Sequence, residues 1–437
     1  MEEENGELAK KENRHAELVS ASVNIEAPYE LPDGWKWVTI GDCCEKAFSG
    51  KSPKYSKEIT PYKIIGQQAN QRYGIDLTFI KYGTKEFAEA QQDFYYLQYN
   101  DVLLNTLGTG SIGRSGIYKY DEKILTDGHP FVFRTEKKYV ADLLFYYLRL
   151  NEQEIINTAN GSTNQKFLSL KTFLKFPIPL PPTLAEQQRI VNHIETMFAK
   201  LDEAKEKAQN VVDSFETRKA EILHKAFNGQ LKIDNEELKI EDWEDTTIGE
   251  CCKLGSGGTP SKSHPEYYEN GTIPWLKTGE IDWKDIYEVE EKITHEGVDN
   301  SSAKIFPAES VVVAMYGMGV TRGKAAIIKI PTTTNQAVCV LQPNKKLNNR
   351  FLFYYFMCNY WQIREQSVGG NQLNLSGKII ASFPIKLPPL NYQLSIVNFL
   401  DTILEKESRA KEAALAVLEK TAILKKSILA RAFRGEI

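Results

Sequence analysis

A glycine-rich stretch, Gly108-Thr-Gly-Ser-Ile-Gly113, matches the GxGxxG pattern that binds dinucleotide phosphates. In that fingerprint a helix begins inside the motif and its N-terminus binds the pyrophosphate. Here the motif follows Asp101-Val-Leu-Leu104, and the next residues, Arg114–Tyr120, contain another glycine and β-forming side chains typical of a returning strand. A related stretch, Gly317–Gly323, does not keep the glycine spacing. We therefore expect a hairpin tip at both places and no nucleotide site.

Residues that could perform catalysis do not form a recognisable group. The six histidines include no HxxxH pair, and the six cysteines include no CxxC spacing. Four of the cysteines are the vicinal pairs Cys43-Cys44 and Cys251-Cys252. The sequence also has no GxxxxGK[ST] loop, no GxSxG elbow and no Asn/Asp-Pro-Pro-aromatic signature of an amino-methyltransferase. It therefore predicts neither catalytic residues nor a metal site.

Polar loops are the better candidates for binding, because Arg, Lys, Gln and Asn side chains can contact DNA base edges and Lys also binds phosphate. In the first half of the chain the candidates are Lys51, Lys54, Tyr55, Gln67, Gln68, Asn70, Arg72, Thr109, Ser111 and Arg114. In the second half they are Thr259, Ser261, Lys262, Lys277, Thr278, Lys284, Tyr316, Thr321, Arg322 and Lys324. A solvated loop has the same composition, so composition alone leaves base reading open.

The two sets of loops belong to two copies of one unit. Five sequence blocks recur in the same order, at a nearly constant offset of about 208 residues. They are Trp35–Cys44 with Trp243–Cys252, Asp101–Leu104 with Ser310–Val313, Leu144–Leu148 with Leu352–Phe356, Phe176–Pro182 with Phe383–Pro389, and Leu223–Leu231 with Leu429–Ile437. This period is too long for a solenoid and indicates a duplicated pair of domains.

Each copy begins with a segment rich in Gly, Pro and Tyr, at residues 30–185 and 232–391, the latter including a linker at 232–240. Short β-branched runs such as Val311–Val313 predict buried strands, and Asp142–Arg149 and Arg350–Tyr360 predict aromatic-rich helices. The fold class is therefore predicted as α+β, with two globular α/β domains. The prolines in Pro177–Pro182 and Pro384–Pro389 are expected to end regular structure and start a linker.

A long helix is predicted after each proline cluster, within residues 186–231 and 392–437. Its apolar residues recur with the 4-3 spacing of a coiled-coil seam. The seam residues are Ile190, Ile194, Met197, Leu201, Val211 and Phe215 in the first helix, and Ile396, Leu400, Ile403, Val417, Leu424 and Ile428 in the second, which Glu407 and Thr421 interrupt. Residues 186–227 would span about 60 Å. Because each seam needs an apolar partner of equal length, we expect the two helices to pack together; a helix lying on its own domain is the alternative.

Composition narrows the possible partners. The chain has 437 residues, 42% hydrophobic and 26% charged, which is typical of a globular protein. A net charge of −4 argues against nonspecific coating of nucleic acid but allows local basic patches. The longest apolar run, Phe351–Cys358, is much shorter than the ~20 residues of a membrane helix. The polar N-terminal segment, 1–29, lacks a signal core, so a cytoplasmic protein is expected. Within this segment Asn5–Leu8 resembles Asn228–Leu231, as if the chain began with the tail of a repeat.

Together these features resemble the specificity subunit of Type I restriction-modification systems. The resemblance covers residues 30–437 and depends on an ordered set of motifs rather than on a single one. The matching segments are Leu31–Trp35, the hairpin Asp101–Ile117, the loops Gly161–Gln165 and Gly369–Gln372, the run Pro179–Val191 with its weaker copy Leu387–Val397, and the endings Ala226–Gly229 and Ala432–Gly435.

The resemblance implies a function without catalysis in this chain. Each globular domain would be a target-recognition domain that reads one half of a bipartite, asymmetric DNA target. The two helices would form an antiparallel coiled-coil spacer, related by a pseudo-twofold axis, and would dock two modification subunits, which restriction subunits then join. Adenine-N6 methylation with S-adenosylmethionine, and cleavage with ATP and Mg, would belong to those partners, and no cofactor would bind this chain. Two alternatives are a coiled-coil scaffold with protein- or glycan-binding heads, and the specificity chain of a related two-subunit restriction system.

Overall fold

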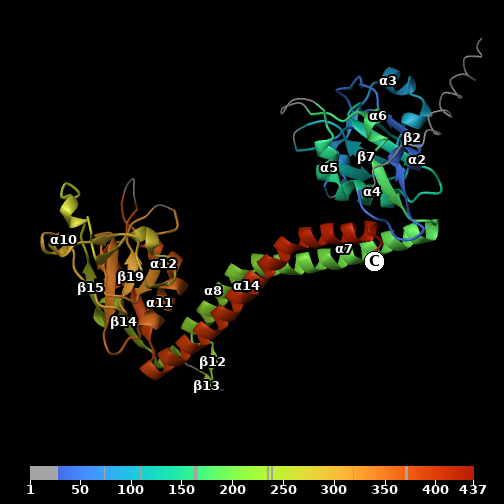
Figure 1. Ribbon diagram of the computed structural model, residues 1–437. Helices are drawn as coiled ribbons and strands as arrows, with labels where there is room; N and C mark the ends of the chain where they lie inside the picture. The colour runs from blue at the N-terminus through green and yellow to red at the C-terminus, as the bar shows by residue number, and fades with distance from the viewer. Residues whose placement is uncertain are drawn as a thin grey trace, which may run out of the picture. The chain divides into compact units, whose positions relative to one another are not determined.

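The computed structural model describes residues 28–437, except residues 73, 109, 161–165, 234–235, 238–239, 318 and 370–372. Asn5–Leu8, Thr109, Gly161–Gln165 and most of Gly369–Gln372 therefore lie outside the described residues. The chain forms two compact units, one made of the residues up to Lys207 with Val417–Ile437, the other of Ala208–Ala416. Each unit combines a globular domain with the adjoining parts of the long helices (Figure 1).

The first unit contains a four-stranded antiparallel sheet in the order β2-β10-β7-β8, formed by Cys44–Ser49, Pro130–Thr135, Val102–Asn105 and Ser115–Ile117. A second sheet, β6-β3-β9, consists of Lys81–Tyr82, Lys63–Ile65 and Ile124–Thr126, and its β3 and β9 are parallel. Two short pairs join β1 (Lys36–Thr39) to β11 (Pro177–Leu180) and β4 (Asn70–Gln71) to β5 (Gly74–Ile75).

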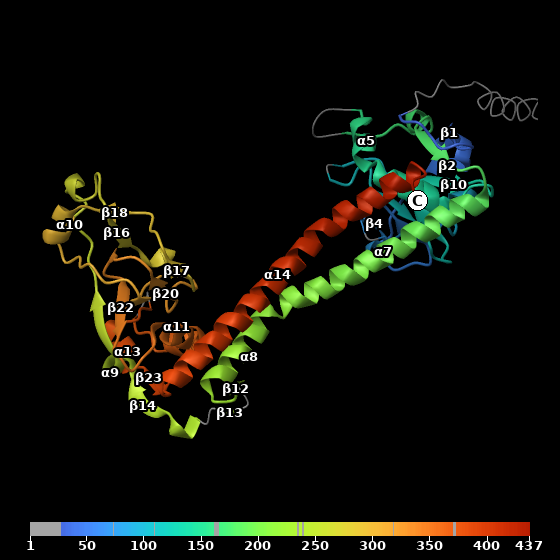
Figure 2. The same cartoon turned by 60° about the horizontal axis from the view of Figure 1, so that its bottom comes forward.

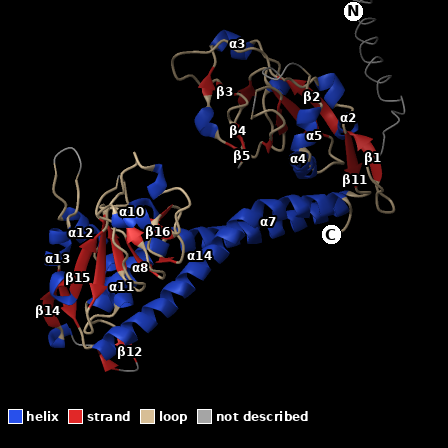
Figure 3. Ribbon diagram, turned by 60° about the vertical axis from the view of Figure 1, so that its left-hand side comes forward, coloured by secondary structure: helices blue, strands red, loops and turns tan. Residues whose placement is uncertain are grey.

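The second unit repeats this plan (Figure 3). Its main sheet, β15-β22-β19-β20-β17, consists of Cys252–Ser256, Val338–Pro343, Val311–Ala314, Ala325–Ile328 and Asp285–Ile286. A three-stranded sheet, β18-β16-β21, consists of Lys292–Ile293, Ile273–Leu276 and Thr333–Thr334. The strand pairs are β14 (Glu244–Thr247) with β23 (Pro384–Leu387), and β12 (Lys232–Ile233) with β13 (Glu236–Glu237).

Helices flank these sheets and connect them. In the first unit they are α2 (Ile40–Cys43), α3 (Lys85–Glu89), α4 (Ala141–Leu150), α5 (Glu152–Asn157) and α6 (Leu170–Phe173). In the second they are α9 (Ile248–Cys251), α10 (His295–Asp299), α11 (Asn349–Cys358), α12 (Tyr360–Glu365) and α13 (Gly377–Ser382). The long helices are α7 (Leu184–Asp213), α8 (Phe215–Phe227) and α14 (Leu390–Phe433). Short 3-10 turns lie at Leu77–Phe79, Asp93–Tyr95, Ile240–Asp242, Pro265–Tyr267 and Thr278–Glu280.

The repeated Thr-Ile-Gly-Asp/Glu sequence is a helix start. Thr39 and Asp42 form a capping box at α2, and Thr247 and Glu250 form the same box at α9. Such boxes satisfy backbone N–H groups that a helix leaves free at its first turn. The isoleucine that follows each threonine is fully buried. The repeat therefore fixes both the start of a short helix and its contact with the core.

The proline clusters end regular structure only at their last two prolines, Pro181-Pro182 and Pro388-Pro389, and the earlier prolines lie within strands, contrary to the sequence prediction. Pro177 and Pro179 lie in β11, whose only partner among the described residues is β1, and Pro384 lies in β23, paired with β14. A proline removes one backbone donor, which an edge strand tolerates because that position need not donate to a neighbour. Ile178 and Ile385 in these strands are buried in the two cores. The first prolines of each cluster thus lie in edge strands, and the last two lie in the short connection to the long helix.

The two long helical segments pack antiparallel within each unit (Figure 2). In the first unit Lys425 of α14 binds Asp202 of α7 at 2.6 Å, and its ammonium lies 4.9 Å from the Phe198 ring centroid. In the second unit Arg218 of α8 binds Glu407 of α14 at 2.8 Å. Ser214 separates α7 from α8, while α14 runs without a break. Gly229 and Gly435 follow the helix ends with φ of 65° and 70°, as expected for C-terminal glycines.

The predicted seam holds for most of its residues but shifts along α14. Ile190, Ile194, Ile396 and Leu400 are fully buried, and Met197, Leu201, Val211, Phe215, Ile403 and Ile428 are half-buried. Val417 and Leu424, however, are 40% and 47% exposed, whereas Thr421 is only 5% exposed. A straight helix has 3.6 residues per turn and drifts away from a strict 3.5-residue repeat, which moves the buried face by about one residue over several turns. Glu407 and Thr421, which interrupt the sequence pattern, therefore lie on the packed side.

Candidate nucleic-acid interface

Both glycine-rich stretches are hairpin tips, as the sequence predicts. The first joins the antiparallel strands β7 and β8, and the second joins β19 and β20. Gly108, Gly110 and Gly113 have φ of 95°, 87° and 80°, and Gly317, Gly319 and Gly323 have φ of 142°, 63° and 88°. Residues with side chains rarely adopt these values, so glycine allows the chain to turn back here. We call the described residues within 108–114 and 316–324, which leave out residues 109 and 318, the first and second tip loops.

The two tip loops close with the same backbone pairing. In the first, the Asn105 N–H donates to the Arg114 carbonyl at 2.9 Å; in the second, the Ala314 N–H donates to the Lys324 carbonyl at 3.0 Å. Arg114 and Lys324 are therefore equivalent in register. Their side chains have separate roles, because the Lys324 ammonium binds Asp282 at 2.6 Å.

In the first domain, the loop at 67–72 packs against the first tip loop. The Asn70 side-chain amide donates to Asn105 Oδ1 at 3.1 Å and to the Arg114 carbonyl at 3.0 Å. Asn70 is completely buried in this structure, and its predicted contact with DNA stays a prediction. An amide suits both a DNA base edge and a backbone carbonyl, and here its partners are within the chain. Asn70 holds the two loops together.

Arg114 is also engaged inside the first domain. One terminal nitrogen donates to the Gly110 carbonyl at 2.8 Å, and the other lies 3.4 Å from the Asn70 carbonyl and 3.3 Å from Gln71 Oε1. A guanidinium bound to three oxygens of two loops fixes their relative position. Arg114 therefore braces the first tip loop.

In the second domain, helix α12 braces the tip loop. Arg364 donates to the carbonyls of Arg322 and Gly319, the latter at 2.7 Å, and the Tyr360 hydroxyl donates to the Val320 carbonyl. Neither Arg364 nor Tyr360 is among the residues predicted from the sequence to bind DNA. The pattern in the sequence that indicates this pair is an arginine four residues after a tyrosine on a short helix, because side chains at this spacing lie next to each other.

Buried polar atoms without a hydrogen-bond partner cluster at these loops. Within the described part of the chain they are Gln67 Oε1, Asn70 Oδ1, Arg114 Nε, Ser115 Oγ, Thr126 Oγ1, Arg322 Nε, Ser367 Oγ and Asn374 Oδ1. All but Thr126 lie in a tip loop or in a segment adjoining it. Because most buried polar groups in proteins are paired, unpaired ones mark a place where a ligand or a rearrangement supplies partners.

Comparison with known proteins identifies the family. The family model of the Type I restriction modification DNA specificity domain matches residues 32–213 and again residues 240–420. The chain belongs to this DNA specificity family.

Relatives and solved structures agree with this assignment. The chain is 28% identical to the EcoR124I/EcoR124II specificity subunit of Escherichia coli over 61% of this chain and 64% of that protein. It is 25% identical to the putative MjaX specificity subunit of Methanocaldococcus jannaschii over 88% of this chain and 90% of that protein. The HsdS subunit from Thermoanaerobacter tengcongensis has the same fold, with a TM-score of 0.67, 19% identity and coverage of 94% of this chain and 100% of that one.

The family assignment makes this chain the DNA specificity subunit of a Type I system, whose catalytic activities reside in its modification and restriction subunits. This decides against a scaffold with protein- or glycan-binding heads. The part of the specificity subunit that the structure describes contains no helix that could cross a membrane, and no group of His, Cys, Asp and Glu residues that could hold a metal ion.

The other predicted DNA contacts of the specificity subunit's first domain lie at its surface or near it. Lys51, Lys54, Tyr55, Gln68 and Arg72 are exposed, and Gln67 and Ser111 are half-buried. Arg72 forms a two-pronged ion pair with Glu152 of α5, at 2.9 and 3.1 Å. The ammonium of Lys81 lies 5.1 Å from the Tyr55 ring centroid, and Ser111 donates to the Leu107 carbonyl. Arg72 and Gln68 are thus beside the first tip loop, while Lys51 to Tyr55 belong to another loop.

The second domain distributes its predicted contacts in the same way. Thr259, Ser261, Lys262, Lys284 and Tyr316 are exposed, and Lys277, Thr278, Thr321 and Arg322 are half-buried. Lys277 is ion-paired with Glu291, and Thr259 donates to Gln336 at 2.6 Å. The Ile327 N–H of β20 donates to the Lys284 carbonyl. Because β20 directly follows the second tip loop, Lys284 lies near that loop. Burial, followed by the nearby Arg364 charge, lowers the pKa of Arg322.

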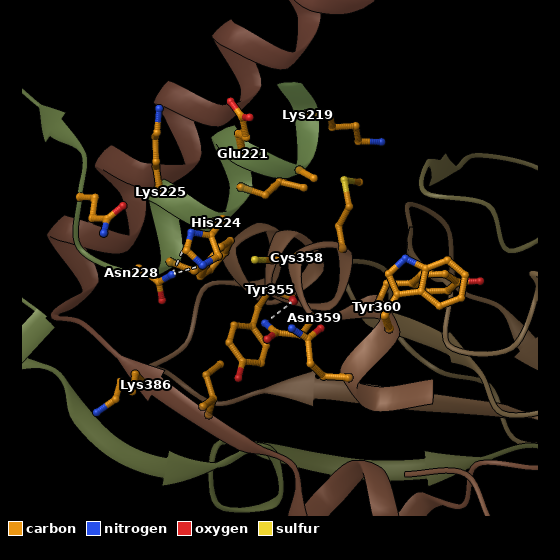
Figure 4. A pocket seen from close by; sticks show the side chains of 18 of the residues that line it. Lys219, Glu221, His224, Lys225, Asn228, Tyr355, Cys358, Asn359, Tyr360 and Lys386 are labelled. Carbon is orange, nitrogen blue, oxygen red and sulfur yellow. Dashed lines mark hydrogen bonds between the residues drawn. The ribbon is translucent and has the colours of Figure 1, made fainter. Parts of the chain in front are cut away.

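A cleft of about 990 Å³ lies between α8 and the second domain (Figure 4). Lys219 and His224 of α8, with Asn228 directly after it, line one wall, and Tyr355 and Cys358 of α11 line another. The Asn228 amide contacts the His224 ring. Burial raises the pKa of the Cys358 thiol to about 11, so this thiol is protonated near neutral pH and is a weak nucleophile. The cleft therefore offers a shaped surface rather than an activated nucleophile.

Proposed function

We propose that each globular domain of this specificity subunit reads one half of a bipartite DNA target, using its tip loop and the loops packed against it. The observation that carries the proposal is the duplication of a braced glycine hairpin, whose closing backbone pairing is the same in both domains. Two related domains can each bind one half-site of a DNA duplex, in the same way that the two subunits of a symmetric dimer bind the two halves of an operator. The side chains of the two tip loops differ, so the two half-sites are expected to differ in sequence.

The long helices supply the remaining two roles, which are spacing and docking. A helix pair of fixed length sets the distance between two half-sites, because helix length grows by 1.5 Å per residue. Exposed apolar side chains on α14 support docking: Val417, Ile423 and Leu424 are 40%, 65% and 47% exposed in the first unit. Such side chains on a charged helix are typical of protein interfaces. We assign this face to a modification subunit; two such subunits and the restriction subunits complete the proposed complex.

Cofactor chemistry is assigned to these partners. The modification subunits would transfer a methyl group from S-adenosylmethionine to adenine N6, and the restriction subunits would use ATP and Mg. This chain would recognise the target sequence and hold the modification subunits in position on it. The complex would act in the cytoplasm, where the DNA lies.

A domain exchange tests the proposal. The chain is expressed with its modification subunit, and the methylated motif is read from the host genome by sequencing. Replacing residues 30–183 with the same segment of another family member should change one half of the motif and keep the other half and the gap. A motif without two separated halves, or a change in both halves on exchange, would contradict the proposal.

A further inference from the structure

We propose that Arg364 is a positioning residue that fixes the second tip loop, residues 316–324, and so determines the second half-site without contacting DNA. The inference rests on the proposed function of the tip loops. It adds a specificity-determining residue on α12, outside every loop that the sequence predicts to read DNA.

The contacts of Arg364 reach along the backbone of the loop. Its two terminal nitrogens donate to the Arg322 and Gly319 carbonyls, which lie three residues apart and on either side of the carbonyl that Tyr360 binds. A Cβ added to Gly323 would lie 3.0 Å from Arg364 Cγ, so the loop also packs closely on the aliphatic part of this side chain. Three backbone carbonyls of one loop are therefore bound by two side chains of one helix.

The guanidinium is itself held in place by aromatic rings. It lies 5.1 Å from the ring centroid of Tyr360 and 5.6 Å from that of Trp361. Tyr360 packs edge-on against Trp283, with ring centroids 5.5 Å apart. Among the described residues no carboxylate lies within ion-pair distance of Arg364, so the loop carbonyls and the rings are its main partners. Cation–π contacts of this kind orient an arginine at a partly exposed site.

The loop needs such a brace because of its sequence. Three of its residues are glycines in left-handed conformations, and glycine has more freedom to lose on ordering than any other residue. Without the brace, the side chains that the loop presents would sample many positions, and discrimination between bases would fall. The first tip loop provides independent support: Arg114 donates to the Gly110 carbonyl at 2.8 Å, as Arg364 does to the equivalent Gly319 carbonyl at 2.7 Å.

The experiment compares methylated motifs of substituted chains expressed with the modification subunit. Arg364→Ala should lower discrimination at one or more bases of the second half-site by about tenfold, because charged hydrogen bonds to the loop are lost. The first half-site should not change. Arg364→Lys, which keeps the charge but not the fork of donors, should be intermediate. Gln362→Ala, an exposed neighbour on α12, is the matched control and should keep the wild-type motif.

Thermal unfolding of each chain separates positioning from general stability. If Arg364→Ala does not fold, Tyr360→Phe, which removes only the hydroxyl, becomes the decisive variant and should relax the same half-site. A wild-type motif in the folded Arg364→Ala chain, or an equal loss at both half-sites, would overturn the proposal. A wild-type chain that methylates no bipartite motif would instead overturn the function on which the proposal rests.

Discussion

Gln187 and Gln393 make corresponding contacts in the two halves of the chain. Gln187 Oε1 accepts a hydrogen bond from the Val140 N–H at 2.9 Å, and Gln393 Oε1 accepts one from the Asn348 N–H at 2.8 Å. Val140 and Asn348 are the N-cap residues of α4 and α11. Both glutamines lie near the start of a long helix and are buried, at 3% and 0% exposure. Each therefore attaches the aromatic helix of its domain to the long helix that follows.

Replacing Gln393 with alanine should destabilise the second unit. Its amide also donates to the Lys346 and Pro388 carbonyls at 2.8 and 2.9 Å, so the substitution removes the partner of three backbone groups, one buried and two part-buried. We expect a loss of about 1–3 kcal/mol in the free energy of unfolding. Gln187→Ala should cost less, because its amide has one distant partner, the Lys138 carbonyl at 3.4 Å.

Urea unfolding measures these losses, and amide hydrogen exchange at Asn348 locates the first of them. Gln188→Ala is the control, because Gln188 is exposed and bonds only to Asn192 within its own helix. Equal effects of the Gln188 and Gln393 substitutions would show that the buried contacts contribute little.

Arg72→Ala should relax one position of the first half-site, at a cost of about 1–3 kcal/mol in binding. Its side chain is 68% exposed, and its ion pair with Glu152 holds the guanidinium beside the first tip loop. Glu152→Gln should leave the unfolding free energy nearly unchanged, since exposed ion pairs contribute about 0–1 kcal/mol. The methylated motif and binding of the complex to variant DNA duplexes check both. Equal weakening on all sequences would assign Arg72 to phosphate contact.

A charge on the exposed face of α14 should prevent docking of a modification subunit. Leu424→Glu places a carboxylate in an interface that would otherwise bury an apolar side chain, and a buried unpaired charge is costly. The isolated chain should keep its melting temperature, because Leu424 is 47% exposed in it. Size-exclusion chromatography with the modification subunit measures assembly. Lys426→Glu, an exposed residue two positions after Leu424 and so on another side of the helix, serves as a control for the added charge. Assembly of the Leu424→Glu chain would reject this face.

Lengthening the helices should lengthen the gap between half-sites. Four residues inserted after Ala208 in α7, with four more after Val417 in α14, add about 6 Å of helix. One base pair adds roughly 3.4 Å, and part of the insertion is absorbed as a local coiled-coil stutter. We expect both half-sites to persist with a gap longer by one base pair, or at most two. Larger insertions should abolish methylation, because each base pair turns one half-site by about 35°.

The methylated motif before and after insertion is the measurement. An unchanged gap with full methylation would mean that the helices do not set the spacing. Changed bases within a half-site would mean that the helices take part in reading.

The sequence predicts the elements whose pattern is local. Glycine spacing places both hairpin tips, and apolar periodicity places the long helices, because turn conformation and helical burial depend on nearby residues. The predicted seam is wrong at Val417 and Leu424 because a strict heptad pattern assumes 3.5 residues per turn, whereas a straight helix has 3.6. The prolines in β11 and β23 were misassigned because an edge strand, unlike a central one, can accept them.

The candidate site is harder to predict because one side chain can serve two purposes. Asn70 and Arg114 have the chemistry of base-reading residues, yet both bind the loop backbone. Arg364 donates a hydrogen bond to the Gly319 carbonyl of a loop that lies 45 positions earlier in the chain. Only the tertiary fold reveals which donors are already used and which remain for DNA.

The two tip loops differ in the sequence separation between the arginine that braces the loop and the glycine carbonyl that it binds. Arg114 and the Gly110 carbonyl are four positions apart, so this bond moves with the first hairpin, whereas the bonds of Arg114 to Asn70 and Gln71 span 44 and 43 positions. Arg364 and Gly319 are separated by 45 positions, so the second hairpin and the helix that binds its backbone are encoded in two separate segments. Recombination between related genes therefore keeps the first hairpin with its whole brace only when residues 67–114 are exchanged together. At the second hairpin, a crossover between loop and helix would separate the proposed reading surface from its support, so we expect the segment from the loop to α12 to be exchanged as one piece.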